Sequence, residues 1–178
     1  MEKMSTVHTL IKNRVAIIEI SRPEQLNALS MRVLIDLKNA FQSIEVDDEV
    51  GVIILTGKGD KAFIAGADIK EMSGFSSEEA IDYALKGQSL TTYIENFPKP
   101  VIAAINGFAL GGGCEFAMAC HIRYASETAR LGQPEVGLGL IAGFGGTQRL
   151  PRLVGKGYAL EILLSGGMLS ASDAKEMG

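Results

Sequence analysis

The chain has 178 residues, which is enough for one globular domain with a buried core. Hydrophobic residues make up 47% of it and charged residues 21%, a balance that excludes a disordered or fibrous protein. The formal net charge of −4 provides no general attraction to nucleic acid or to an anionic membrane, so we expect neither partner.

The first half of the chain predicts an alternation of strands and helices. Short β-branched runs predict strands, and apolar residues at helical spacing after a capping residue predict helices. The strands are expected at residues 14–20, 50–56 and 62–65, and the helices run from Ser30 to Asp48, from Ile69 to Met72 after Asp68, and from Ser76 to Pro98. Glu79 completes a capping box with Ser76.

The second half continues the alternation. The predicted order is a strand at 101–105, a loop at Gly107–Gly113, a helix at Cys114–Cys120, strands at 122–125 and 130–132, and helices at 148–154, 156–164 and 172–177. The uncharged run from Pro100 to Cys114 divides into these pieces, and Asn106 and Glu115 would be costly in a bilayer, so no membrane span is predicted. The strand-strand-helix pattern recurs about every 40 to 50 residues, and we expect residues 1–178 to form a single domain.

Two segments are suited to exposing backbone N–H groups. Residues 63–68 (FIAGAD) and 110–115 (LGGGCE) each leave a predicted strand and enter a helix, where the first N–H groups have no helical partner. The amides of Ala67 and Gly112 could therefore form an oxyanion hole. For either segment taken alone, tight turns and close helix packing are the favoured explanation of the glycines.

Three acidic residues are candidates for chemistry. Glu115 stands in the first turn of an otherwise apolar helix, where it could hold or deprotonate a water, or be a charge satisfied by the backbone. Glu135 follows a short strand, and composition alone favours an ordinary loop residue that faces solvent, because glutamate is common on surfaces. Asp68 is expected to be the N-cap of the short helix at the edge of a binding site.

Several other site classes are not indicated. His8 and His121 lack a second ligand at a fixed spacing, and Cys114 and Cys120 lack paired metal-ligand spacing, so we expect no metal and reduced thiols. The chain has no G-x-x-x-x-G-K-S/T loop, no G-x-G-x-x-G fingerprint and no G-x-S-x-G turn. Nucleotide binding and a nucleophile-elbow hydrolase are therefore disfavoured.

Taken together, four motifs in order resemble the enoyl-CoA hydratase family of the crotonase superfamily. They are residues 62–72 (AFIAGADIKEM), 99–107 (KPVIAAING), 109–115 (ALGGGCE) and 145–150 (GGTQRL), and the likeness runs from Arg22-Pro23 to Lys175. The resemblance implies an α/β fold of the crotonase type, a spiral of repeated ββα units. It also implies assembly into homotrimers, often paired into hexamers.

The resemblance implies syn addition of water to 2-trans-enoyl-CoA thioesters, as in fatty-acid β-oxidation. Glu115 and Glu135 match the two catalytic glutamates, and Ala67 and Gly112 match the oxyanion donors to the thioester carbonyl. Residues that match the CoA-contacting edge and the water-lining loop are Ala28, Ala65, Asp68, Ile69, Lys70 and Gly143. Coenzyme A then arrives as part of the substrate, and we expect no separate cofactor and a cytoplasmic location.

Three departures from the family pattern stand out. Ala142 occupies a common proline position beside Gly143, and His121, which replaces a common Asp, is expected to be a fold contact. Relatives continue beyond Gly178 into C-terminal helices that complete the trimer, so we expect those trimerisation helices to be missing or truncated here. Another crotonase-type reaction such as enoyl-CoA isomerisation, or a non-catalytic RNA-binding relative, remains an alternative, although the helix at 31–48 carries no basic stripe.

Overall fold

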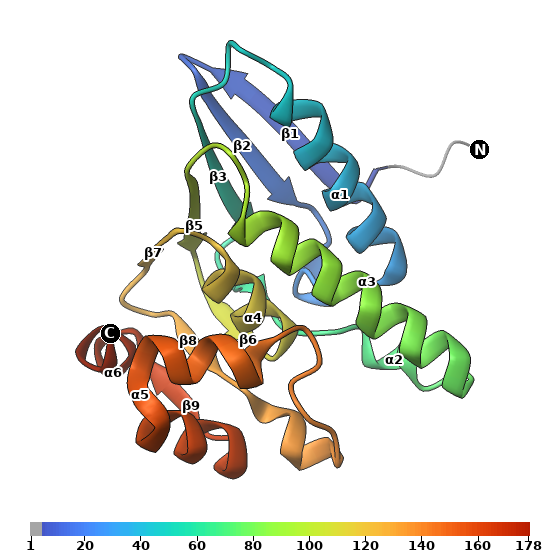
Figure 1. Ribbon diagram of the computed structural model, residues 1–178, viewed down its shortest axis with the longest axis vertical. Coiled ribbons are helices and arrows are strands. Elements are labelled where there is room, and N and C mark those ends of the chain that lie inside the picture. The colour runs from blue at the N-terminus through green and yellow to red at the C-terminus, as the bar shows by residue number, and fades with distance from the viewer. Residues whose placement is uncertain (1–4) are drawn as a thin grey trace.

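The computed structural model describes residues 5–178; residues 1–4, which the predicted single domain also included, lie outside the described residues. Its strands form two sheets (Figure 1). The five-stranded sheet has the order β1 (Val7–Lys12), β2 (Val15–Ile20), β3 (Val52–Gly57), β5 (Val101–Ile105) and β7 (Ile122–Ala125). The four-stranded sheet has the order β4 (Ala62–Ile64), β6 (Phe108–Leu110), β8 (Arg130–Gly132) and β9 (Met168–Ser170).

Successive strands alternate between the two sheets from β3 to β8, and helices separate the pairs. The helices are α1 (Met31–Glu45), α2 (Ile69–Met72), α3 (Ser77–Glu95), α4 (Gly112–Ala119), α5 (Gly146–Ser165) and α6 (Ala171–Met177), with 3₁₀ turns η1 (Pro23–Gln25) and η2 (Pro134–Leu138). Pairing is parallel within each sheet except between β1 and β2 and between β8 and β9. The predicted spiral of ββα units is confirmed.

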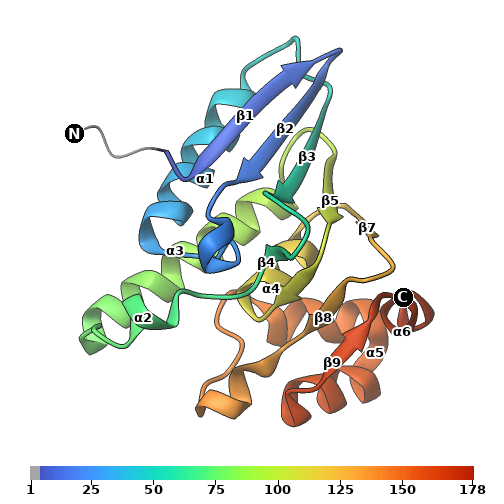
Figure 2. The ribbon, with the colours of Figure 1, turned by 180° about the vertical axis from the view of Figure 1, so that it is seen from behind.

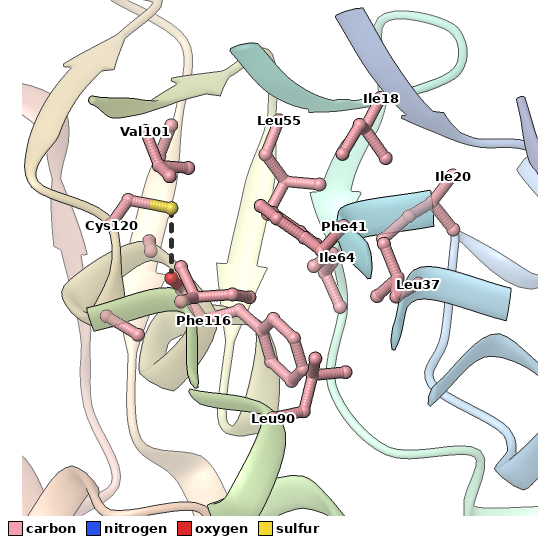
Figure 3. Packing of buried hydrophobic residues seen from close by; sticks show 14 of the residues in the cluster. Ile18, Ile20, Leu37, Phe41, Leu55, Ile64, Leu90, Val101, Phe116 and Cys120 are labelled. Carbon is pink, nitrogen blue, oxygen red and sulfur yellow. Dashed lines mark hydrogen bonds between the residues drawn. The ribbon is translucent and has the colours of Figure 1, made fainter. Parts of the chain in front are cut away.

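Helix α1 packs on β1 and β2, and α3 packs against α1 and α4; seen from behind, in Figure 2, β1 and β2 lie in front of α1. Alternate residues of β2, β3 and β5 are buried, as the period of a strand requires. They meet side chains of α1 and α4 in one core, which includes Ile18, Leu37, Phe41, Leu55 and Phe116 (Figure 3). Each such side chain contributes about 1.5–3 kcal/mol by leaving water.

The predicted helix starts are confirmed by their capping bonds. Ser30 accepts the N–H of Val33 at 3.3 Å, and Ser76 forms the predicted capping box with Glu79. The two helices expected at 148–154 and 156–164 both lie within the span α5, and they meet at a kink at Gly155, whose backbone is non-helical (φ 78°, ψ 162°). Within residues 5–178, every helix is too short or too polar to cross a bilayer.

Three strands were not predicted, β1 and the three-residue strands β6 and β9. In β1 only Val7 is buried, so no alternation marks the strand, and it pairs with β2 through a turn in which Asn13 and Arg14 have positive φ. Strand β6 lies inside the predicted glycine loop at 107–113, and β9 follows two glycines before α6. Strands β6 and β9 lie next to glycines that indicate a loop, and pairing with β8 orders both of them.

Candidate active site

Three parallel strands, β4, β6 and β8, end at the same edge of the four-stranded sheet. Ala62 is the register partner of Phe108, and Leu110 is that of Gly132. The segments that follow these strands are therefore neighbours, and they carry the predicted oxyanion donors and Glu135. Crevices at the carboxyl ends of parallel strands are where ligands usually bind in α/β proteins.

The amide of Ala67 is oriented by an exchange of hydrogen bonds with the segment before α1. Leu29 donates its N–H to the Gly66 carbonyl at 2.8 Å, and Asp68 donates its N–H to the Leu29 carbonyl at 2.8 Å. The Gly66 carbonyl and the Ala67 N–H belong to one peptide group, so holding the first fixes the direction of the second. Gly112 is the first residue of α4, and its N–H has no partner within that helix.

A cavity of about 890 Å³ joins these amides to the two glutamates. Its volume is that of a site for a small organic molecule. Seven of the ten predicted site residues line it: Ala65, Ala67, Ile69, Gly112, Glu115, Glu135 and Gly143. The structure thus brings together the four residues predicted for chemistry, which are separated by up to 68 positions, from Ala67 to Glu135.

Glu115 is a buried carboxylate, 1% exposed, with one oxygen bound to backbone amides. Its Oε1 accepts the N–H groups of Phe144 at 2.7 Å and Gly146 at 2.6 Å. Burial raises the pKa of Glu115 to about 7, and the charge of Glu135 adds to the rise, whereas the two amides and Arg149 oppose it. Backbone amides do bind the Glu115 carboxylate, which was one of its two expected roles, but they come from the loop at residues 143–146 and not from its own helix, and this loop also lines the cavity.

Glu135 lies in η2 and is partly buried at the cavity wall instead of facing bulk solvent. A Cβ built on Gly111 would lie 2.8 Å from its Oε1, so the carboxylate rests beside the start of α4. When the Gln133 amide is oriented with its nitrogen toward Glu135, that nitrogen donates to the two carboxylate oxygens at 3.0 and 3.1 Å. Burial raises the pKa of Glu135, which favours retention of a proton.

The other three predicted residues, Ala28, Asp68 and Lys70, line a second hollow, whose wall at Ala67 and Ile69 is shared with the cavity. Asp68 is the N-cap of α2, as predicted, and also accepts a hydrogen bond from Arg22 at 3.0 Å. The residues expected at a CoA-contacting edge are thus divided between two adjoining hollows.

Two expectations outside the site can also be compared with the structure. His121 accepts the Val101 N–H at 2.9 Å through Nδ1, which is the expected fold contact. Cys114 and Cys120 are free and buried, and burial raises the pKa of each thiol to about 12. No group of three His, Cys, Asp or Glu side chains among the described residues could hold a metal ion.

Sequence reasoning assigned no role to several residues that shape the site. Gln133 and Arg149 are both buried, and Arg149 binds the carbonyl of Phe144 at 2.9 Å. Arg149 belongs to the motif at 145–150 and Gln133 lies two residues before Glu135, but a polar residue in a loop or on a helix gives no sign that it faces inward. Phe144 was likewise indistinguishable from a core residue.

Similarity in sequence and in fold to known proteins places the chain in a family. The sequence model of the family described as enoyl-CoA hydratase/isomerase matches residues 10–178. The chain is 48% identical to the crotonyl-CoA hydratase of Syntrophomonas wolfei and 49% identical to the short-chain-enoyl-CoA hydratase of Clostridium acetobutylicum, over 94% of this chain and 64% of each relative. A crystal structure of an enoyl-CoA hydratase from Bacillus anthracis superimposes with a TM-score of 0.94 at 44% identity, covering 97% of this chain and 67% of that one. The chain therefore spans about two thirds of the length of these proteins.

Proposed function

The chain belongs to the enoyl-CoA hydratase/isomerase family, and on that premise we propose that it carries the catalytic centre of an enoyl-CoA hydratase. The reaction is the reversible syn addition of water to a 2-trans-enoyl-CoA, which gives a 3-hydroxyacyl-CoA. One observation supports this proposal above the others: two carboxyl groups and two backbone amides from three different segments line a single cavity. Hydration of an enoyl thioester needs both kinds of group, because a water must be activated while negative charge develops on the thioester oxygen.

In the proposed mechanism the thioester carbonyl accepts hydrogen bonds from the amides of Ala67 and Gly112. Glu115 removes a proton from water as the water oxygen bonds to C3, and the electrons of the double bond move onto the thioester oxygen as an enolate. The enolate collapses as C2 takes a proton from Glu135. Transfer of the proton from Glu115 to Glu135 then restores the starting state.

The protonation states required by this scheme follow from the environments of the two acids. Glu115, with a pKa of about 7, is ionised in roughly half of the molecules at neutral pH, so it can accept a proton. Burial also raises the pKa of Glu135. Because two negative charges in one cavity repel each other, the pair Glu115 and Glu135 favours the state in which one of the two carries a proton.

We propose that CoA lies along the two adjoining hollows, against Ala28, Ala65, Asp68, Ile69 and Lys70. The acyl group then occupies the larger cavity, whose apolar walls include Met72, Tyr83 and Leu140. Gly143 lies on the loop that lines the cavity, on the side where the proposed mechanism places the attacking water. No cofactor other than the CoA of the substrate is needed for this chemistry.

The test is the decay of the enoyl thioester absorbance when crotonyl-CoA is mixed with the chain and with its Glu115→Gln and Glu135→Gln variants. Decay with the parent and a loss of at least about 100-fold in each variant would support the proposal, because general acid–base catalysis contributes about 10²–10⁴-fold. Product identification separates hydration from isomerisation. Binding of CoA without turnover by the parent would contradict a hydratase activity of this chain.

We also propose a homotrimer or a dimer of trimers and a cytoplasmic location, both on the strength of the family. Light scattering of the purified protein measures the assembly. A filter-binding assay with RNA tests the remaining alternative, and salt-sensitive retention of RNA would favour an RNA-binding role instead.

A further inference from the structure

The loop of residues 143–146, which supplies both amides to Glu115, is held from behind by helix α3. Gln88 on α3 donates from Nε2 to the carbonyl of Gly143 at 2.8 Å. The N–H of the same peptide group, that of Phe144, donates to Glu115 Oε1 at 2.7 Å. The two bonds lie on opposite ends of one rigid peptide plane, so the first sets the direction of the second.

The next peptide group of the loop is fixed by a buried polar cluster. The carbonyl of Phe144 accepts from Thr91 Oγ1 at 2.8 Å and from Arg149 Nη1 at 2.9 Å. Thr91 is 0% and Arg149 9% exposed. Arg149 is oriented by Glu95, whose Oε2 accepts from its Nε at 3.1 Å and its Nη2 at 2.8 Å.

The Phe144 ring adds an apolar contact to the same helix. A Cβ on Gly87 of α3 would lie 2.2 Å from ring atoms, so the ring packs directly on the helix backbone. Tyr83 and Phe116 lie against the ring with centroid distances of 5.3 and 6.3 Å. Hydrogen bonds and apolar packing therefore both hold the loop against α3.

We propose that Gln88, Thr91 and Arg149 are positioning residues, which act through the loop to hold its amides on one oxygen of Glu115. The other oxygen of Glu115 has no hydrogen bond within the described residues, and the residue lines the cavity, so this oxygen is the one available to a water. The arrangement of the loop stands on geometry alone. Its effect on turnover rests on the proposed function.

The proposal has a consequence that can be measured without turnover. Hydrogen bonds from amides favour the ionised carboxylate, so loosening the loop raises the pKa of Glu115. The charged and titratable groups that act on Glu115 or are affected by its charge are Glu135 from η2, Arg149 from α5, Tyr83 from α3 and Cys114 from α4. Replacing Gln88 removes no hydrogen bond to any of the four, whereas replacing Thr91 also removes the hydrogen bond that its Oγ1 accepts from Arg149 at 3.2 Å, so Gln88→Met is the cleaner test.

The experiment is a ¹³C NMR titration of the glutamate carboxyl groups in the parent, Gln88→Met and Thr91→Val, with the Glu115 signal assigned from Glu115→Gln. Gln42→Met and Ser89→Ala are the matched controls, because both side chains are exposed on helices α1 and α3. We expect the Glu115 pKa to rise by about half a unit or more in the two test variants and to stay unchanged in the controls. A Glu115 pKa that is unchanged or lower in both folded test variants overturns the proposal. Gln88 is exposed, so its replacement does not threaten the fold.

A parallel measurement of crotonyl-CoA hydration separates the two proposals. If the parent is active, kcat should fall about 10- to 100-fold in both test variants, because a small misplacement of a reacting group has that cost. The acidic limb of the pH profile should move upward together with the NMR pKa. If the parent is inactive, the hydratase proposal fails and the NMR titration still decides the positioning role.

Discussion

Replacing Glu115 with Gln should change the pH dependence of stability in a direction fixed by the structure. The ordinary pKa of a glutamate is 4.5, and burial raises that of Glu115 to about 7 in the folded protein. Between these values the folded state holds a proton that the unfolded state has released. The stabilising contribution of this group is thus fully present below pH 4.5 and is lost as the pH rises through 7.

The magnitude follows from the two pKa values. One pH unit corresponds to about 1.4 kcal/mol, so ionisation of Glu115 lowers the free energy of unfolding by about 3 kcal/mol between pH 4.5 and pH 8. A glutamine at this position cannot ionise, and its side-chain oxygen can still accept the amides of Phe144 and Gly146. The difference in stability, variant minus parent, should therefore rise by about 3 kcal/mol over this range.

Urea unfolding of both proteins at several pH values, followed by far-UV circular dichroism, measures this difference; the chain has no tryptophan to report by fluorescence. Curves of stability against pH that run parallel for parent and variant would refute the reasoning, since they would place the folded pKa near the unfolded one. Glu127→Gln, at an exposed position in the loop between β7 and β8, is a control for the loss of a carboxylate elsewhere, and it should not reproduce the effect.

Three further outcomes are expected elsewhere in the fold. Gly113→Ala should destabilise the protein by about 3 kcal/mol or more, measured by thermal unfolding, because the added Cβ would lie 1.9 Å from the carbonyl oxygen of Ile64. Ser76→Ala should cost about 1 kcal/mol in the same assay through loss of the α3 capping box, and Ser76→Asp should restore most of it. Cys114 and Cys120 should resist iodoacetamide at pH 8 until denaturant is added, since both thiols are buried with pKa values of about 12, and modification of the folded protein would contradict this burial.

The helices could be predicted because their signals are local. Ser30, Ser76 and Asp68 each cap a helix that the sequence placed within a few residues of its position in the structure. The three-residue strands β6 and β9 carry no comparable signal, since each is ordered by its pairing with β8, which lies more than 15 residues away along the chain. Tertiary contacts of this kind leave no trace in local composition.

Some residues of the candidate site likewise carry a local signal in the sequence, whereas others are placed only by tertiary contacts. A glutamate within an apolar helix and a glycine loop before it are unusual enough to draw attention to Glu115 and Gly112. The approach of Glu135 to the same cavity depends on the register of β6 and β8, which only the folded chain defines. Thr91 and Gln88 could not have been found, because threonine and glutamine on an amphipathic helix are indistinguishable from its solvent-facing residues.

Close backbone contacts around strand β4 explain why two of the 21 glycines in the chain, Gly107 and Gly113, are needed. Added Cβ atoms would lie 2.2 Å from the Lys61 carbonyl oxygen at Gly107 and 1.9 Å from the Ile64 carbonyl oxygen at Gly113. The β5–β6 turn and the first turn of α4 therefore press directly on the backbone at the two ends of β4. A strand confined in this way cannot shift along its length without a clash, and the Ala67 amide follows it by three residues. The position of the Ala67 amide, one proposed oxyanion donor, thus depends on close backbone contacts that are possible only because residues 107 and 113 are glycines. Gly113→Ala should therefore weaken CoA-thioester binding and turnover as well as stability.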